Sequence, residues 1–251
     1  VVMISIVGDA FALPLIEEMK KGNHTLASLR FFLNSGAHLS VKTKRELVRL
    51  LPKTRILDFL GSSEGGNQGQ HVDDLEGNAP GTFSLSPGNA VLNDTKTALL
   101  EPGHEGTGWW ARQGYVPIGY LNDEAATKKT FVELAGERYA IAGDRAQLLP
   151  GDIVRLLGRD SLVINSGGEK VFVEEVEEAL KKHAAVKDAL VLGRQSARWG
   201  QEVVAVIAFQ DGQRADLEEI KTECARHVAR YKLPKAVFVV PEILRHANGK
   251  P

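Results

Sequence analysis

The segment with the clearest chemical potential is Gly61-Ser62-Ser63-Glu64-Gly65-Gly66, which follows a short apolar run at residues 55–60. Glycines let backbone N–H groups approach a ligand, Ser hydroxyls donate to phosphate oxygens, and a carboxylate binds a hard cation such as Mg2+. These residue types in this order have the chemistry that suits the phosphates of a nucleotide. Taken alone, a solvated Gly/Ser turn is the favoured interpretation, because short motifs often match by chance.

Two further pairs follow strand-like runs. The carboxylate of Asp144 in Gly143-Asp144 can accept hydrogen bonds from both hydroxyls of a ribose. The guanidinium of Arg159 in Gly158-Arg159 can contact ribose or phosphate. For each pair alone, an ordinary turn or a surface Arg is the more frequent explanation.

Two loops nearer the C-terminus carry the remaining candidates. In Ser166-Gly167-Gly168-Glu169-Lys170, the double glycine lets the backbone lie against a ligand chain, or serves a hinge or tight turn. The two interpretations stay open at this level. Asn248-Gly249-Lys250 presents an ammonium group at a turn, and a solvated Lys is the default there.

The composition of the chain argues against several classes of protein and of site. The 251 residues contain 31 Lys plus Arg against 32 Asp plus Glu, a net charge of -1, which gives no bulk support to nucleic-acid or membrane-surface binding. Cys224 is the single cysteine, so an internal disulfide is excluded and a cytoplasmic setting is expected. The seven histidines are scattered, which argues against a structural zinc site. The longest purely apolar run, residues 203–209, is far shorter than the ~20 residues of a membrane helix.

The elements that must position these residues alternate between strand-like and helix-like patterns up to residue 60, and the first helical pattern covers Pro14 to Lys21. This alternation predicts βαβ units and a mostly parallel sheet, in which ligands bind beyond the carboxyl ends of the strands. Two loops lie at such ends, Ser35-Gly36-Ala37 and the segment from Gly61 to Gly66. These two loops are therefore the candidate ligand-binding loops of this region.

Two changes of pattern follow. Residues 71–122 are punctuated by Pro-Gly pairs, which predicts short antiparallel strands, arranged as a small distorted β-barrel. Beyond Asp160-Ser161, a helical stripe of Val173, Val176 and Leu180, a second helical pattern and several strands predict a small α+β domain. The predicted fold is thus α/β and α+β, with residues 1–160 as the end of a large domain and residues 161–251 as a small one. Both chain ends look cut from a longer sequence.

The order of these motifs carries more weight than any one of them. Gly-Ser-Ser-Glu, Gly-Asp, Gly-Arg-Asp-Ser-Leu-Val-Ile-Asn-Ser-Gly-Gly-Glu-Lys-Val and Asn-Gly-Lys occur in the order found in acyl- and aryl-CoA synthetases. The segment from Gly119-Tyr120 to Thr127 is also similar to that family's Gly-Tyr-x-Asn-x-x-x-x-Thr. The chain resembles the C-terminal half of an adenylate-forming enzyme, with the best likeness to fatty-acyl or sterol-side-chain CoA ligases.

The resemblance implies roles for the candidate residues. Gly36 and Ala37 would flank the adenine, and the opposite wall would consist of Phe59, Leu60, Gly61 and Ser62. Ser63 would contact the α-phosphate, and Glu64 would bind Mg2+. Asp144 and Arg159 would hold the ribose. Gly167, Gly168 and Glu169 would guide the pantetheine of CoA, and Lys250 would bridge the acyl carboxylate and the α-phosphate. The small domain would swing about Ser161 as a mobile lid.

Three departures from the family pattern stand out. Leu60 replaces a frequent Tyr, so the aromatic contact with the adenine would either be lost or be taken over by Phe59. Ser161 replaces the usual Asp or Lys at the hinge. The phosphate-binding loop ending in Pro-Lys-Gly is expected upstream of Val1, so the fragment alone is expected to be inactive.

The implied activity is that of an acid–thiol ligase of lipid metabolism, which converts a carboxylic acid, ATP and CoA into acyl-CoA, AMP and pyrophosphate. No protein nucleophile is needed for this chemistry, in agreement with the unremarkable setting of Cys224. Two alternatives stay open: an adenylation domain that loads a carrier protein, and a non-catalytic protein that binds a nucleotide or a partner. The acyl chain and the oligomeric state are not determined by the sequence.

Overall fold

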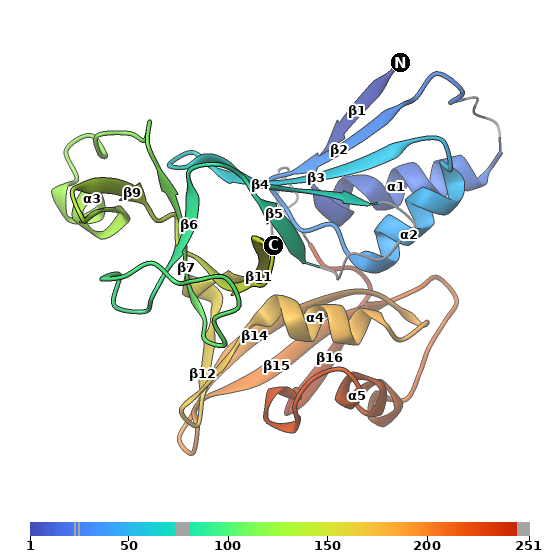
Figure 1. The fold of residues 1–251 in the computed structure, drawn as a ribbon. Helices are drawn as coiled ribbons and strands as arrows, with labels where there is room; N and C mark the ends of the chain where they lie inside the picture. The colour runs from blue at the N-terminus through green and yellow to red at the C-terminus, as the bar shows by residue number, and fades with distance from the viewer. Residues whose placement is uncertain (23, 25, 74–80, 245–251) are drawn as a thin grey trace. The chain divides into compact units, whose positions relative to one another are not determined.

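The alternating segments near the N-terminus form a parallel sheet in a computed structural model, which describes residues 1–22, 24, 26–73 and 81–244. The elements are β1 (Met3–Ile6), α1 (Gly8–Lys20), β2 (Phe31–Ser35), α2 (Val41–Leu50) and β3 (Arg55–Ser62). Strands β1, β2 and β3 are parallel neighbours, and α1 and α2 cover one face of them (Figure 1). The predicted βαβ arrangement is therefore confirmed.

Apolar packing against the helices holds this layer together. Ile6, Phe32 and Ile56, one from each strand, are almost fully buried, and they form one core with residues of α1 and α2 that include Ala12 and Leu47. Helix α2 begins at the cap residue Ser40, whose hydroxyl accepts a hydrogen bond from the backbone N–H of Thr43. The sheet edge at the strand ends is fixed by this packing.

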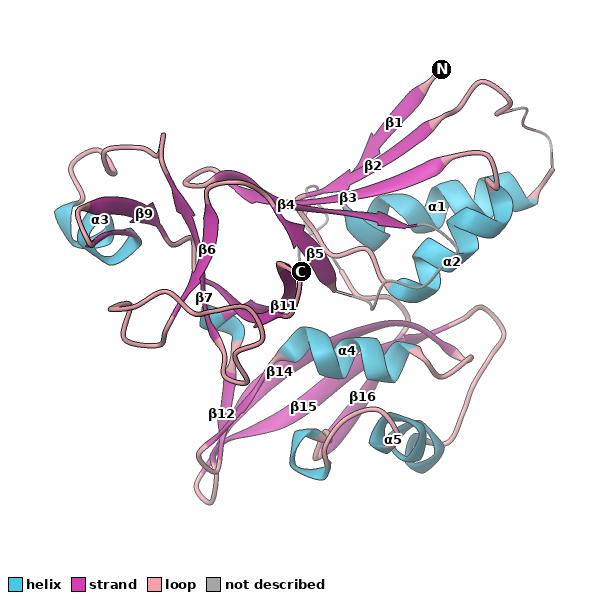
Figure 2. Cartoon of the chain, viewed as in Figure 1, coloured by secondary structure: helices cyan, strands magenta, loops and turns pink. Residues whose placement is uncertain are grey.

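Antiparallel strands extend the same sheet (Figure 2). They are β4 (Gly66–Asp73), β5 (Thr82–Leu85), β6 (Asn89–Leu92), β7 (Gly108–Gln113), β8 (Phe131–Leu134), β9 (Glu137–Ala140), β10 (Asp144–Leu149) and β11 (Ile153–Arg159), with the short helix α3 (Glu124–Thr130) before β8. The order is β1-β2-β3-β4-β5-β11-β10-β7-β9-β8, and β6 pairs with β7.

The predicted small β-barrel is wrong in one respect, because this path of strands is open. Among the strands of the described residues, β8 pairs with β9 and β1 pairs with β2, and no pairing joins β1 to β8 at the two ends of the path. Pro and Gly turns mark short antiparallel strands in a sequence, but they do not specify which strand the last one joins.

The C-terminal region is an α+β unit, as predicted. It contains β12 (Ile164–Ser166), β13 (Glu169–Val171), α4 (Val173–Lys181), β14 (Val186–Ser196), β15 (Gly200–Phe209), α5 (Leu217–Ala225) and β16 (Ala236–Val240), with short 3-10 helices at Asp160–Leu162 and Arg230–Lys232. The sheet order is β13-β12-β15-β14, and β16 pairs with β15 in parallel.

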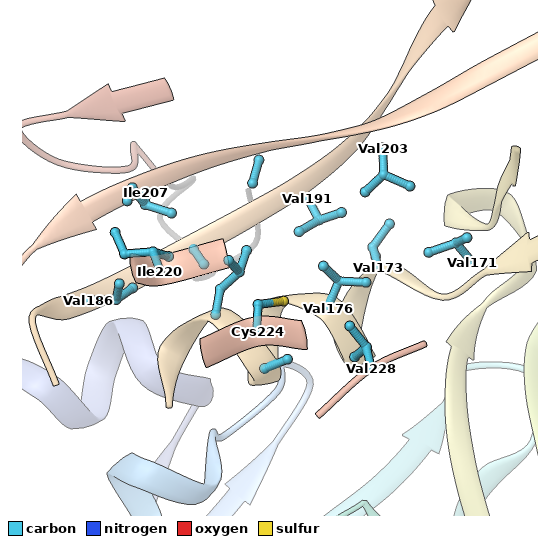
Figure 3. Packing of buried hydrophobic residues seen from close by; sticks show 14 of the residues in the cluster. Val171, Val173, Val176, Val186, Val191, Val203, Ile207, Ile220, Cys224 and Val228 are labelled. Atoms are coloured by element: carbon cyan, nitrogen blue, oxygen red, sulfur yellow. The ribbon is translucent and has the colours of Figure 1, made fainter. Parts of the chain in front are cut away.

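Its core lies between the helices and the sheet (Figure 3). The predicted stripe of α4, Val173, Val176 and Leu180, is buried there, together with Cys224 of α5. Burial raises the pKa of the Cys224 thiol to about 11, which leaves it protonated and unreactive near neutral pH. Cys224 is therefore a core residue.

Contacts along the chain separate two units, Val1–Leu157 and Gly158–Pro251. The predicted domain boundary and hinge at Asp160-Ser161 stay a prediction, since a contact division does not show motion. None of the helices in the described part of the chain has both the length and the apolar character needed to cross a bilayer.

Candidate functional site

A buried polar network lies beneath the carboxyl ends of β2 and β3. The side-chain amide of Asn34 donates to Asp58 Oδ1 at 2.7 Å and to the carbonyl of Ala37 at 3.1 Å, and its oxygen accepts from the backbone N–H of Gly8 at 2.7 Å. Lys44 of α2 pairs with Asp58 Oδ2 at 2.7 Å. Because each charge has a partner, this network can stay buried and can hold the loop after β2 in place.

The two predicted walls of the adenine site come from these neighbouring strands. Ser35 lies opposite Phe59 in the parallel register, so Gly36 and Ala37, which follow Ser35, lie at the edge of the sheet near Phe59 and Leu60. Phe59 and Leu60 are both half-buried. The structure thus brings the two segments to one edge of the sheet.

The turn after β3 closes on itself. The hydroxyl of Ser62 accepts the backbone N–H of Gly65 at 2.9 Å, so this hydroxyl and this N–H are used within the turn. Ser63 is exposed, and its hydroxyl can face a ligand. A side chain at Gly61 would meet the carbonyl oxygen of Gly66 at 2.5 Å, so the close return of the chain needs a glycine there.

Glu64 is bonded to a residue distant in the sequence. The phenol of Tyr120 donates to Glu64 Oε1 at 2.7 Å. This hydrogen bond to the carboxylate is the main cause that raises the pKa of Tyr120 above its usual value. The motif around Gly119-Tyr120 was the available sequence signal, but the sequence alone did not assign Tyr120 a role.

Glu64 has the donor type that suits magnesium. Mg2+ in proteins is commonly held by one or two carboxylates together with substrate phosphates. Within the described residues, no cation pairs with Glu64, and no cluster of three or more His, Cys, Asp or Glu could enclose a metal. A single carboxylate beside an exposed hydroxyl therefore fits a metal that arrives with a phosphate ligand.

Asp144 belongs to the same unit. It begins β10 and is only 5% exposed. Strand β10 pairs with β7, with Arg145 opposite Trp109, and Arg112 of β7 approaches Gly65 in the turn after β3. Strand β7 thus lies beside both β10, which Asp144 begins, and the turn after β3.

The sequence did not indicate a structural role for Arg145, the residue after Asp144. Arg145 is almost fully buried, its guanidinium contacts Asp94, donates to Thr107 Oγ1 at 3.1 Å and lies 4.3 Å from the centre of the Trp109 ring. These contacts hold the start of β10 in place. A charged residue in a strand carries no sequence signal that separates such a buried role from an exposed one.

The other candidates belong to the second unit. Arg159 is exposed at the end of β11. Gly167 and Gly168 form the two-residue turn of the β12–β13 hairpin, in which Ser166 pairs with Glu169 and both glycines have positive φ values of 61° and 90°. Of the two interpretations of the double glycine, the structure shows the tight turn.

An aromatic side chain supports this hairpin turn. The N–H of Gly167 donates to the carbonyl of Trp199 at 2.9 Å, and the Trp199 ring lies 2.8 Å from where a side chain of Gly167 would begin. Arg198 and Lys235 lie 4.6 and 5.9 Å from the centre of that ring. Trp199 is 37% exposed, so the turn lies beside an accessible indole with two cations.

Lys250 lies outside the described residues, so its predicted role is carried by the resemblance alone. The other predicted residues fall into two groups. Those from Gly36 to Asp144 lie in the first unit, and Arg159, Gly167, Gly168 and Glu169 lie in the second.

Comparison with known proteins supplies the family. Residues 175–250 match the AMP-binding enzyme C-terminal domain. The chain is 48% identical over 250 residues to the medium-chain acyl-CoA ligase Mig of Mycobacterium avium, covering 100% of this chain and 46% of the relative. It is 42% identical over 258 residues to 3-oxocholest-4-en-26-oate–CoA ligase of Rhodococcus rhodochrous, covering 99% and 46%. The chain is therefore homologous to the C-terminal part of acyl-CoA ligases, and residues 175–250 match the C-terminal domain of AMP-binding enzymes.

A solved CoA synthetase shares the fold. The o-succinylbenzoate CoA synthetase of Bacillus subtilis, in complex with its acyl-adenylate intermediate, superimposes with a TM-score of 0.79 at 25% identity, over 100% of this chain and 49% of that one. The chain spans about half the length of the curated relatives it matches, and its homologues are CoA ligases. The resemblance inferred from the motifs is confirmed.

Proposed function

We propose that the full-length protein containing this chain is an acyl-CoA ligase that activates a carboxylic acid with ATP and transfers the acyl group to CoA. The observation that carries the proposal is the 48% identity to a medium-chain acyl-CoA ligase along the whole chain. Relatives named for medium- or long-chain fatty acids and for a sterol side-chain acid support a large apolar acid as the substrate. A cytoplasmic setting with access to ATP and CoA suits this activity.

In the first half-reaction, a carboxylate oxygen attacks the α-phosphorus of ATP and pyrophosphate leaves, which forms an acyl-adenylate. The protein contributes alignment and charge. Gly36, Ala37, Phe59, Leu60, Gly61 and Ser62 would bind the adenine, the exposed hydroxyl of Ser63 would donate to the α-phosphate, and Asp144 and Arg159 would hold the ribose. Lys250 would neutralise charge between the acyl carboxylate and the phosphate.

Glu64 would hold the magnesium that accompanies ATP. When bound, the metal would neutralise negative charge on the phosphates. The support from this chain is the half-buried position of Glu64 in the turn after β3 and its fixed orientation toward Tyr120.

In the second half-reaction, the thiolate of CoA attacks the acyl carbon and AMP leaves. We expect the Gly167–Gly168 turn to guide the pantetheine arm, because two glycines leave no side chain in its way. The exposed indole of Trp199, with Arg198 and Lys235 beside it, suits the adenine and phosphates of CoA. Free CoA is therefore the proposed acceptor.

The test is carboxylate-dependent exchange between ATP and pyrophosphate, measured with the full-length protein. Exchange in the wild type and its loss in Lys250→Ala are expected, and unchanged exchange in that variant would contradict the role of Lys250. The isolated 251-residue chain is expected to show little or no exchange. Supplying free CoA or a carrier protein to the preformed acyl-adenylate then decides the acceptor, and absence of exchange in the wild type would favour a binding protein.

A further inference from the structure

Tyr120 and Glu64 are 56 residues apart, yet they form one side-chain hydrogen bond. The phenol oxygen lies 2.7 Å from Glu64 Oε1. Both groups lie at the surface of the unit, where water competes for each of them. A bond in that position has a defined geometry only if one partner is held in place by other contacts.

The backbone of Tyr120 is held by the start of α3. Its N–H donates to Thr127 Oγ1 at 2.8 Å, and that hydroxyl donates to the carbonyl of Asp123 at 2.7 Å. Asp123 caps α3 by accepting the N–H of Ala126 at 2.9 Å. The hydroxyl of Thr127 therefore connects Tyr120 to a capped helix.

The ring of Tyr120 is held from the other side. It packs against Phe131, with ring centres 5.8 Å apart, and Phe131 is buried. Arg138 lies 5.1 Å from the centre of the Phe131 ring and donates to the carbonyl of Ile118 at 2.6 Å. Contacts on the ring, at the backbone and in the preceding loop thus restrict Tyr120.

A second tyrosine in the same loop shows that this restriction is not general. Tyr115 is fully exposed, and within the described part of the chain no hydrogen bond or ring contact involves it. The loop therefore exposes one phenol to solvent and directs the other to the carboxylate in the turn after β3.

We propose that Tyr120 is a positioning residue, which holds the carboxylate of Glu64 in the orientation that it uses toward the magnesium of the ATP complex. This inference rests on the proposed function of the same site. A partner that fixes the orientation of a ligating carboxylate commonly strengthens metal binding. Tyr120 acts through Glu64 and needs no contact with ATP itself.

The experiment compares full-length wild type with Tyr120→Phe, Glu64→Gln and the control Tyr115→Phe, which removes a hydroxyl from the exposed tyrosine. The readout is the affinity for Mn2+ in the presence of a non-hydrolysable ATP analogue, measured by electron paramagnetic resonance. Tyr120→Phe is expected to weaken Mn2+ binding by roughly tenfold, Glu64→Gln by at least as much, and Tyr115→Phe not at all.

A further variant separates positioning from a general loss of structure. Thr127→Val removes the acceptor of the Tyr120 N–H, and we expect it to weaken Mn2+ binding less than Tyr120→Phe does, whereas Thr127→Ser, which keeps the hydroxyl, restores wild-type binding. Wild-type Mn2+ affinity in Tyr120→Phe would overturn the inference, whether or not Glu64→Gln weakens binding.

The experiments distinguish a failure of the proposed ligase activity from a failure of the proposed role of Tyr120. Absence of carboxylate-dependent exchange in the wild type would contradict the ligase activity, while the Mn2+ measurement still compares the variants because it requires no turnover. A wild type that exchanges normally, together with a Tyr120→Phe variant that binds Mn2+ normally, would reject only the role of Tyr120.

Discussion

The two glycine-containing turns that carry the candidate residues are stabilised in different ways. The Ser62–Gly65 turn is held by hydrogen bonds, from the N–H of Gly65 to Ser62 and from Tyr120 to Glu64. The Gly167–Gly168 turn is held by its hairpin register and by the ring of Trp199. A carboxylate is oriented in the first turn, whereas a smooth backbone beside an indole is exposed in the second.

This contrast matches the two halves of the proposed reaction. A metal–phosphate complex needs a carboxylate held at one angle, which hydrogen bonds provide. A flexible pantetheine arm with a nucleotide at its end needs an unobstructed path and a stacking surface. Damage to one turn should therefore slow one half-reaction and leave the other close to its wild-type rate.

The largest effect is expected from Glu64→Gln. Glutamine lacks the negative charge with which Glu64 would hold the magnesium on the ATP phosphates. This loss should lower the rate of ATP–pyrophosphate exchange by roughly 100-fold. The rate at which preformed acyl-adenylate reacts with CoA should change little, because pyrophosphate has already left. Rapid-quench measurement of each half-reaction checks this, and an equal loss in both would remove the distinction between the turns.

Trp199→Ala should impair the second half-reaction and leave the first unchanged. Loss of a stacking surface for the adenine of CoA is expected to raise the KM for CoA by roughly tenfold, since base stacking on an aromatic side chain contributes ~1–3 kcal/mol. Exchange in the absence of CoA should stay at the wild-type rate. A KM for CoA that does not move would show that the indole only supports the hairpin.

Gly167→Ala tests the support of the second turn and has a matched control. Gly167 and Gly212 both have positive φ, 61° and 72°, but only a side chain at Gly167 meets the Trp199 ring. Alanine in the left-handed region costs about 1 kcal/mol at either position. We expect Gly167→Ala to lose more stability than Gly212→Ala in thermal unfolding, and to slow thioester formation several-fold. Equal losses would show that the ring adapts without cost.

The smallest effect concerns the core beneath the second turn. The pKa of Cys224 is about 11 in the folded chain, raised from 9.0 by burial. Because the unfolded thiol loses its proton first, the contribution to stability is complete below about pH 9 and is lost as the pH rises toward about 11. Cys224→Ala should flatten this part of the pH–stability curve for the second unit. A slope that persists in the variant would assign it to other groups.

Much of the fold followed from local pattern. The stripe Val173, Val176 and Leu180 predicted α4 and its buried face, because helical periodicity is written directly in the residue types. The residue pattern predicts the start of α1 at Pro14, but the helix begins at Gly8. At Gly8 the chain passes so close to the loop after β2 that a side chain would meet the carbonyl oxygen of His38 at 2.6 Å, and such a close approach has no local signature.

For the candidate site, the sequence predicted several residues but not the side chains that contact them. The motif order named Glu64 and the Gly167–Gly168 turn, but it assigned no partner to either. The phenol of Tyr120 and the ring of Trp199 come from segments distant along the chain, and their orientation depends on α3 and on the pairing of Ser166 with Gly200. Neither periodicity nor spacing carries that information.

By itself, the sequence determined the family, the alternation of elements and the residue types available for phosphate, metal and thiol chemistry, because these depend on local composition and on motif order. Only the tertiary structure decided that the predicted barrel is open, that Asn34, Asp58 and Lys44 form a buried network, and that Tyr120 reaches Glu64. Strand pairing and side-chain hydrogen bonds are settled by packing between segments far apart in the chain, and a single sequence does not record that packing.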